Sequence, residues 1–309
     1  MSAPDRAPPP LVAIVGPTAA GKSDLAVALA ERLGGEVVNA DSMQLYRGMD
    51  IGTAKLSVAD RRGVPHYLLD VLDVTEPAAV ATFQDWARAA VDDCRARAVA
   101  PVLVGGSALY VRAVLDRFEF PGTDHAVRAE LEADLATAGP AALHARLAAD
   151  DPAAAAAILA TNGRRIVRAL EVVRLTGRPF SASLPGYDYA YDRVVQVGVD
   201  VAREVLEQRV ADRVDRMWST GLVDEVRRLE SAGLREGRTA SRALGYAQVL
   251  RQLAGQCTEQ EARDETVRAT RRFARRQDSW FRKDPRIGWL DHDGDDLVDR
   301  AVAAVGGCG

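Results

Sequence analysis

The segment LVAIVGPTAAGKSD, residues 11–24, combines three features that together indicate one class of fold. Its first five residues, Leu11 to Val15, are continuously apolar, which is typical of a strand buried on both faces of a parallel sheet. A glycine-containing turn follows. The next segment, SDLAVALAERLGG, spaces its apolar residues as a helix does, and Gly34 predicts where that helix ends. A buried strand, a tight turn and a helix in this order predict the start of an α/β domain.

Predicted strands and helices continue to alternate for about a hundred residues. EVVNAD, ending at Asp41, reads as a second strand, and VPHYLLDVLDV and APVLVGGS each hold a further one. FQDWARAAVDDCRARA has helical spacing between them. We therefore predict an α/β fold of the P-loop type, with a parallel sheet that helices flank on both faces.

The alternation of predicted strands and helices stops after Phe120. Residues 121–191 are rich in alanine and predict helices only, with Asn162 capping one helix and Gly177 ending it. YDRVVQVGVD then restores a strand, and the chain reads as helical from Arg203 on. We predict a core made of residues 1–120 and 192–309, interrupted by an all-helical insertion, 121–191. The alternative is a single domain with long helical loops. It is disfavoured because residues 121–191 are too long a segment without a predicted strand to be a loop of one α/β domain.

Composition excludes several classes of protein. The chain has 309 residues, 48% of them hydrophobic, and a net charge of −4. No apolar run approaches ~18 residues and the N-terminus has no apolar signal region, so we expect no membrane segment and a cytoplasmic location. The three cysteines, Cys94, Cys257 and Cys308, lie far apart. Their odd number and their spacing argue against a disulfide framework and against a zinc site.

The turn after the first strand, GPTAAGKS, matches the P-loop pattern at every fixed position and has the required strand before it and helix after it. Such a loop folds into a nest of N–H groups at a helix N-terminus, where anions bind. Lys22 would reach the terminal phosphate, and the Ser23 hydroxyl suits Mg²⁺. The residues predicted to bind phosphate are Gly16, Pro17, Thr18, Ala19, Ala20, Gly21, Lys22 and Ser23.

The loop alone leaves its ligand open. An ATPase or GTPase would show a strand that ends in an acid, whereas PVLVGG ends in two glycines and Ser107. Asp41, after the second strand, could be a Mg²⁺ ligand, a general base for a nucleophile other than water, or the cap of a turn with Ser42. The segment DSMQLYRGMDIGTAK, residues 41–55, also carries Gln44 and Tyr46. An acid and an amide together can read an adenine edge.

Several motifs together carry a family resemblance. GPTAAGKS, NADSMQLYRGMDIGTAK, GVPHYLLD, VLVGGSALY, NGRRIVRALEV, RVADRVDRMWSTGLVDEV and SRALGYAQV, in this order, resemble the bacterial tRNA dimethylallyltransferases, also called tRNA isopentenyltransferases. The resemblance runs from about Leu11 to about Trp289. It implies transfer of a dimethylallyl group from dimethylallyl diphosphate to N6 of adenosine 37 beside the tRNA anticodon, with release of diphosphate. Eukaryotic members have a C-terminal zinc finger, and this chain lacks the cysteine and histidine pairs for one.

The resemblance also implies residue roles. Asp41 would be the general base at N6. Gly21, Lys22 and Ser23 would hold the diphosphate with Mg²⁺ near Ser23, and Arg213 would clamp it from the opposite side. Ser107, the third catalytic candidate, stands where the family often has threonine. The residues expected to meet the anticodon arm of tRNA are Ser42, Met43, Gln44, Arg164, Arg165, Arg168, Arg242, Gly245, Tyr246 and Arg272.

The C-terminal third is locally basic. Between Asp264 and Arg286 there are eight Arg or Lys and four Asp or Glu, and Arg272 shares one helical face with Arg268 and Arg275. Such a face can contact RNA phosphates. A solvated helix is the other interpretation. The aromatic residues expected in the core are Trp86, Trp218, Phe273, Trp280 and Phe281.

Three other functions compete with this one. A small-molecule P-loop kinase would use Asp41 as base, but would not need the basic C-terminal third. A transferase acting on free adenine nucleotide would not need the insertion. A non-catalytic RNA-binding protein would not need Lys22, Ser23 and Asp41 together. For the transferase we expect Mg²⁺ as cofactor, tRNA and dimethylallyl diphosphate as partners, no membrane partner and a monomer.

Overall fold

The structure is a computed structural model that describes residues 7–180, 186–294 and 296–307. The chain divides into two compact units. The first consists of Met1–Leu115 with Tyr189–Gly309, and the second is Asp116–Asp188. The interruption of one unit by another is therefore a feature of the structure, and each unit is described by itself below.

The first unit is built on a six-stranded sheet of order β3-β2-β4-β1-β5-β6, in which every pair of neighbours is parallel. This confirms the predicted α/β class. The last strand corrects the expectation that the chain is helical from Arg203 on, because a short run after α10 pairs with β5. The strands are β1 (Leu11–Val15), β2 (Glu36–Asn39), β3 (His66–Tyr67), β4 (Pro101–Gly105), β5 (Val194–Asp200) and β6 (Ile287–Asp291).

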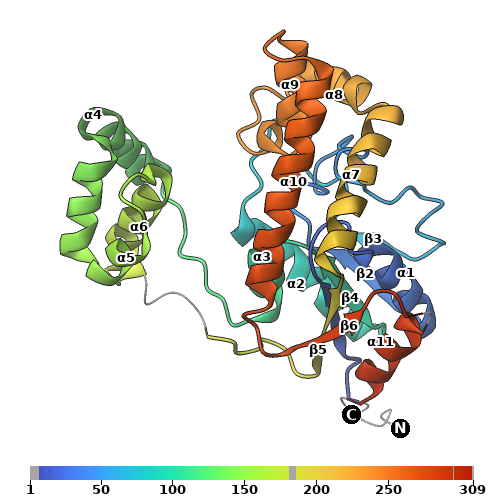
Figure 1. Ribbon diagram of the computed structural model, residues 1–309. Coiled ribbons are helices and arrows are strands. Elements are labelled where there is room, and N and C mark those ends of the chain that lie inside the picture. The colour runs from blue at the N-terminus through green and yellow to red at the C-terminus, as the bar shows by residue number, and fades with distance from the viewer. Residues whose placement is uncertain (1–6, 181–185, 295, 308–309) are drawn as a thin grey trace. The chain divides into compact units, whose positions relative to one another are not determined.

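Helices cover both faces of this sheet (Figure 1). Alternate residues of β1 point to opposite layers: Val12 and Ile14 pack with α1 and α11, whereas Leu11 and Ala13 belong to the larger core on the other face. The helices of this unit are α1 (Lys22–Leu33), α2 (Val80–Ala96), α3 (Ala108–Leu115), α7 (Arg203–Ser219), α8 (Leu222–Ser231), α9 (Tyr246–Leu253), α10 (Glu259–Phe281) and α11 (Leu297–Gly306), with a 3₁₀ turn at Ala240–Arg242.

The long helix α10 lies beside α7 and α9 (Figure 1). Helix α7 buries an apolar stripe that includes Val210 and Val214. The predicted aromatic core is right for Trp218 and Phe281, which are buried. It is wrong for the other three aromatic residues, because α2 and α10 turn those positions to solvent. Trp86 and Phe273 are each 37% exposed, and Trp280 is 52% exposed.

The second unit is helical, formed by α4 (His125–Asp150), α5 (Pro152–Ala157) and α6 (Gly163–Thr176). Asn162 caps α6 by accepting from the Arg165 N–H, and Gly177 ends it in the left-handed conformation, as the sequence predicts. Its small core includes Leu131 and Ile166. No described helix of either unit is both long and apolar enough to span a bilayer.

Candidate active site

The phosphate loop lies between β1 and α1 and has the backbone of an anion nest. Gly16 has φ +139° and Gly21 has φ +92°, values that side chains with a Cβ rarely adopt. The Lys22 ammonium donates to the Pro17 carbonyl at 2.6 Å, so its side chain folds back over the loop. The Thr18 N–H donates to Gln277 and the Ala20 N–H donates to the Pro17 carbonyl, so the other N–H groups of the loop and Lys22 are left for an anion at the N-terminus of α1.

A cavity of about 610 Å³ opens over this loop, and we call it the phosphate-loop cavity. Its walls combine the loop with the ends of β2 and β4 and with one face of α7. Four cations and the three carboxylates Asp24, Asp41 and Asp212 line it, and the cations suit a ligand that carries several negative charges. Among its lining residues are Thr18, Gly21, Lys22, Ser23, Asp41, Gln44, Thr53, Gly105, Gly106, Arg209, Arg213 and Arg216.

A second cavity of about 390 Å³ lies on the side of α10, and we call it the α10 cavity. Thr18, Asp41, Thr53 and Arg213 line both cavities and so form their common boundary. The other residues of the α10 cavity come from the loop after β2, from Ser107, from α7 and α10, and from the end of the 3₁₀ turn at Ala240–Arg242 with the two residues after it. They include Ser42, Met43, Val214, Met217, Arg242, Thr270, Phe273, Arg276 and Gln277.

Arg213 holds the boundary together. One guanidinium nitrogen donates to the Thr18 hydroxyl at 3.1 Å, and the other donates to the Thr53 carbonyl at 3.1 Å. Burial lowers the pKa of Arg213, an effect that the nearby Asp41 carboxylate opposes. The guanidinium therefore bridges the phosphate loop and the loop after β2 at the point where the two cavities meet.

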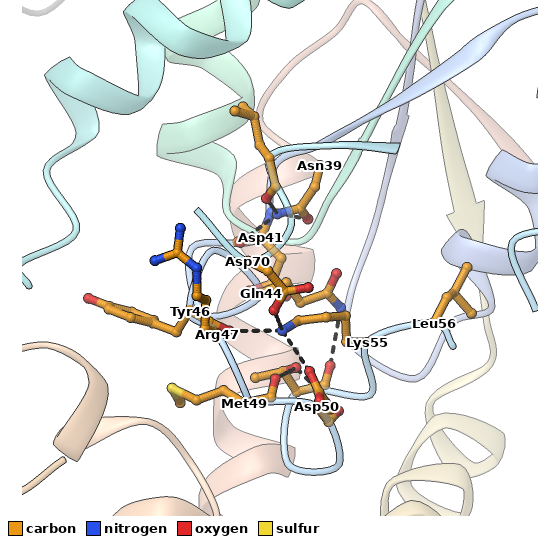
Figure 2. Close-up of polar contacts among 12 residues, drawn as sticks. Asn39, Asp41, Gln44, Tyr46, Arg47, Met49, Asp50, Lys55, Leu56 and Asp70 are labelled. Atoms are coloured by element: carbon orange, nitrogen blue, oxygen red, sulfur yellow. Dashed lines mark hydrogen bonds and ion pairs between the residues drawn. The ribbon is translucent and has the colours of Figure 1, made fainter. Parts of the chain in front are cut away.

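Asp41 is positioned by a buried amide. The Asn39 side chain, 2% exposed, accepts from the Asp41 N–H at 2.9 Å and donates to the Asp41 carbonyl at 3.0 Å (Figure 2). One carboxylate oxygen of Asp41 accepts from the Met43 N–H at 2.9 Å. Asp41 thus caps a turn and also lines both cavities, so the two interpretations of this residue are compatible. Strand β2 ends at Asn39, two residues earlier than predicted.

The loop after β2 is fixed by residues that do not line the α10 cavity. The Lys55 ammonium, buried under the loop, donates to the Tyr46 carbonyl, to Asp50 and to Asp70 (Figure 2). Glu225 of α8, 2% exposed, accepts from the backbone N–H groups of residues 50–52. These contacts hold Thr53 at the boundary, where its carbonyl meets Arg213.

The electrostatics of the phosphate-loop cavity favour an anion. Burial lowers the pKa of Lys22 to about 8, while Asp41 raises it and Arg213 lowers it. A bound diphosphate would add negative charge next to Lys22 and Arg213 and would favour the charged form of both.

The structure brings most of the catalytic and phosphate-binding candidates together. Asp41, Ser107 and Arg213 line the α10 cavity, and Lys22 and Ser23 line the neighbouring one. The residues expected to contact tRNA lie in different parts of the structure. Ser42, Met43 and Arg242 line the α10 cavity, and Arg272 is exposed on α10. Gln44 lies instead at the phosphate-loop cavity, donating to the Thr53 carbonyl at 3.2 Å.

Three of the residues expected to meet tRNA have structural roles here. Tyr246 is fully buried and donates to the Glu225 carboxylate at 2.6 Å, and Gly245 is buried at the start of α9. Arg168 pairs with the fully buried Glu171, as Arg128 does. Burial would raise the pKa of Glu171, but these two arginines lower it. Gly245 and Tyr246 are therefore buried in this structure, and Arg168 pairs with a buried carboxylate of its own unit.

Tyr46, which belongs to the same segment as Asp41, lines neither cavity. Its side chain is fully buried, and its hydroxyl donates to the Glu76 carbonyl and accepts from the Ala78 N–H, each at 3.0 Å.

In the second unit, Arg164 and Arg165 are exposed at the start of α6.

Sequence reasoning missed Gln277. This residue of α10 is 7% exposed, accepts from the Thr18 N–H at 2.9 Å and donates to the Gly106 carbonyl at 2.7 Å. It therefore ties α10 to the phosphate loop and to the end of β4. A Cβ on Gly106 would lie 2.4 Å from the Gln277 amide nitrogen, which explains the glycine. An uncharged residue inside the arginine-rich run RRFARRQ is the only sequence signal.

Metal binding here would depend on the ligand. Within the described residues, no group of three or more His, Cys, Asp or Glu could hold a metal ion. Mg²⁺ commonly takes few protein ligands and completes its shell with phosphate oxygens and water. The Ser23 hydroxyl at the mouth of the phosphate loop fits that mode.

The parallel sheet, the loop between β1 and α1, and the crevice at the strand ends define a P-loop α/β protein with a candidate phosphate site. A family model described as IPP transferase matches residues 44–284. The chain is 68% identical to the tRNA dimethylallyltransferase of Streptomyces avermitilis, over 96% of this chain and 95% of that one. It is 66% identical to the same enzyme of Thermobifida fusca, over 96% and 94%. The chain therefore belongs to the IPP transferase family of prenyl transferases.

Solved structures of related transferases have the same fold as this chain. The full-length tRNA isopentenylpyrophosphate transferase of Bacillus halodurans has TM-score 0.70 and 41% identity, covering 97% of both chains. A eukaryotic dimethylallyltransferase described as acting on tRNA has TM-score 0.83 and 25% identity, covering 96% of this chain and 78% of that one. The shared fold thus extends over nearly the whole of this chain.

Proposed function

We propose that this enzyme transfers a dimethylallyl group from dimethylallyl diphosphate to N6 of adenosine 37, beside the anticodon of tRNA, and releases diphosphate. One observation carries the proposal. Two cavities, one over a phosphate loop and the other under a basic helix, share a boundary that contains Asp41 and Arg213. A donor diphosphate and an acceptor base bound in the two cavities would meet at that boundary.

The phosphate-loop cavity would bind the donor. Lys22 and the loop N–H groups would bind the diphosphate, and Arg213 would contact it from α7. Ser23 would hold Mg²⁺ together with diphosphate oxygens, and the ion would supply further neutralisation of the leaving group. Charge that develops on the leaving oxygen is thus met by groups already in place, which is the usual source of the largest rate effect.

The reaction joins the adenine N6 to C1 of the dimethylallyl group and breaks the bond from C1 to the diphosphate oxygen. The electron pair of that bond leaves with the diphosphate. N6 must lose one proton, and the Asp41 carboxylate at the boundary would accept it. The Ser107 hydroxyl, which also lines the α10 cavity, would form a hydrogen bond with one of the two reacting substrates. A positioned base of this kind contributes about 10²–10⁴-fold.

The RNA side would be read by cations and by the loop after β2. Ser42 and Met43, which line the α10 cavity, would contact the extruded nucleotide. Arg242 and Arg272 would contact phosphates, a contact type that confers affinity and salt dependence. In the helical unit, the exposed Arg164 and Arg165 would add contacts to the anticodon arm. All groups needed for the chemistry come from one chain, so we propose a monomer. Its tRNA substrate would place it in the cytoplasm.

The proposal is tested by incubating the protein with labelled dimethylallyl diphosphate, Mg²⁺ and an unmodified tRNA that has adenosine at position 37. We expect label in the RNA, located at N6 of that adenosine by mass spectrometry of its nucleosides. A tRNA with guanosine at position 37 is the control and should stay unlabelled. Label on free AMP but not on tRNA, or hydrolysis of ATP without transfer to RNA, would contradict the proposal.

The depressed pKa of Lys22 predicts a pH dependence. With a pKa of about 8 in the free enzyme, the ammonium loses its proton above that pH, and the attraction for the donor diphosphate falls with it. We expect kcat/KM for dimethylallyl diphosphate to decline above about pH 8, whereas kcat persists to higher pH because the bound diphosphate favours the ammonium. Initial rates at low and saturating donor, measured across pH, separate the two.

Lys22→Arg is the control for that profile, since a guanidinium stays charged throughout this range. Its kcat/KM can be lower overall, but the decline above about pH 8 should disappear. A wild-type profile that stays flat well above pH 8 would mean that Lys22 does not govern donor binding through its charge.

A further inference from the structure

Phe273 stands out among the residues of the α10 cavity. It lies on α10, is 37% exposed, and is the only aromatic side chain among the described residues that line this cavity. A phenyl ring in a core would be buried, and a solvated helix face has no need of one. The ring instead lies partly open at a cavity that continues to Asp41.

The surroundings of Phe273 are cationic. The Arg276 guanidinium carbon lies 5.9 Å from the centre of the phenyl ring, and Arg242 lines the same cavity. An aromatic face beside arginines is the combination with which proteins bind unpaired nucleotides, the ring under the base and the cations near the phosphate. The other apolar residues of the cavity, which include Met43 and Met217, have no flat face to offer.

We propose that Phe273 is the stacking platform for the target adenine, and so a binding residue of the acceptor site. This inference rests on the proposed function. An adenine with N6 at Asp41 has left its stack in the RNA loop, which costs up to a few kcal/mol. A single aromatic contact returns about 1–3 kcal/mol, enough to offset much of that cost. Phe273 is placed to supply it at the same cavity.

The first experiment measures binding of a synthetic anticodon stem–loop RNA that carries the target adenosine. Phe273→Leu keeps an apolar side chain of similar size and removes the flat face. We expect it to weaken RNA binding about 5- to 150-fold. Phe273→Trp should restore most of the affinity. Trp280→Leu is the matched control, since Trp280 is an exposed aromatic residue of α10 outside the cavity, and it should change binding about 2-fold or less.

The second experiment identifies the base. The same RNA is made with an abasic site at the target position, so that no adenine can stack. If Phe273 holds the target adenine, the wild-type protein and Phe273→Leu should bind this RNA equally well, because the interaction is already absent. A Phe273→Leu loss that persists on abasic RNA would show that the ring contacts another nucleotide or only supports the fold, and would overturn the inference.

The two proposals fail in different ways. If the wild-type protein neither binds the stem–loop nor prenylates tRNA, the proposed function is wrong. If it does both and Phe273→Leu behaves as wild type on the adenosine RNA, only the role of Phe273 is wrong. Thermal unfolding of each variant excludes a folding defect, which the partial exposure of the ring makes small.

Discussion

Replacement of Asp41 by asparagine should lower kcat about 10²–10⁴-fold while leaving the affinities for tRNA and for dimethylallyl diphosphate within about 2-fold. The amide is nearly the same shape as the carboxylate and can still accept the hydrogen bond from the Met43 N–H, so the turn after β2 should keep its conformation. The substitution removes the capacity to take a proton from N6, together with the negative charge of Asp41 near Lys22 and Arg213. Single-turnover rates with saturating donor, measured beside equilibrium binding of both substrates, test this directly.

Asp60→Asn is the matched control for Asp41→Asn. Asp60 is an exposed carboxylate of the same inter-strand segment, hydrogen bonded to Ser57, and it lines neither cavity of the site. Its replacement should leave kcat unchanged. If Asp41→Asn retained most of the wild-type kcat, the N6 proton would leave by another route and Asp41 would be only the cap of its turn.

The parts of the fold that sequence could predict are those set by local pattern. The continuous apolar run of β1 and the glycines around Lys22 fix a strand, a nest and a helix start within a few residues, because backbone sterics leave little choice there. Asn162 and Gly177 delimit α6 for the same reason. The edge strand β6 was not predictable in this way, since IGWLD is short and becomes a strand only by pairing with β5.

The burial and the hydrogen-bond partners of polar residues depend on tertiary packing, which cannot be predicted from a single sequence. Tyr46 and Tyr246 stand in motifs that resemble ligand loops, yet both are fully buried and give their hydroxyls to the protein itself. Gln277 shows the converse. It lies within a basic run that reads as a solvated surface, yet it bonds to Thr18 and Gly106, more than a hundred residues away. No periodicity connects such positions.

Arg213→Lys should be almost as damaging as Arg213→Ala, with kcat lowered about 10²–10³-fold in both, because a donor aimed at the leaving group is typically worth that much. The guanidinium spans two acceptors, the Thr18 hydroxyl and the Thr53 carbonyl, at 3.1 Å each. A lysine ammonium is a single point of charge and cannot keep both contacts while facing the diphosphate. Charge is conserved in this exchange and geometry is not, so the substitution separates the two contributions.

The matched control is Arg203→Lys on the same helix, where the side chain is exposed and pairs with Glu207, and no effect on kcat is expected. Measuring kcat and the donor KM for all three variants distinguishes two roles for Arg213. A rise in KM with unchanged kcat would mean that it binds the diphosphate equally in substrate and transition state. A fall in kcat means that it acts on charge that appears only as the allylic C–O bond breaks. Full activity in Arg213→Lys would contradict the bridging role, because it would show that positive charge alone suffices where the two cavities meet.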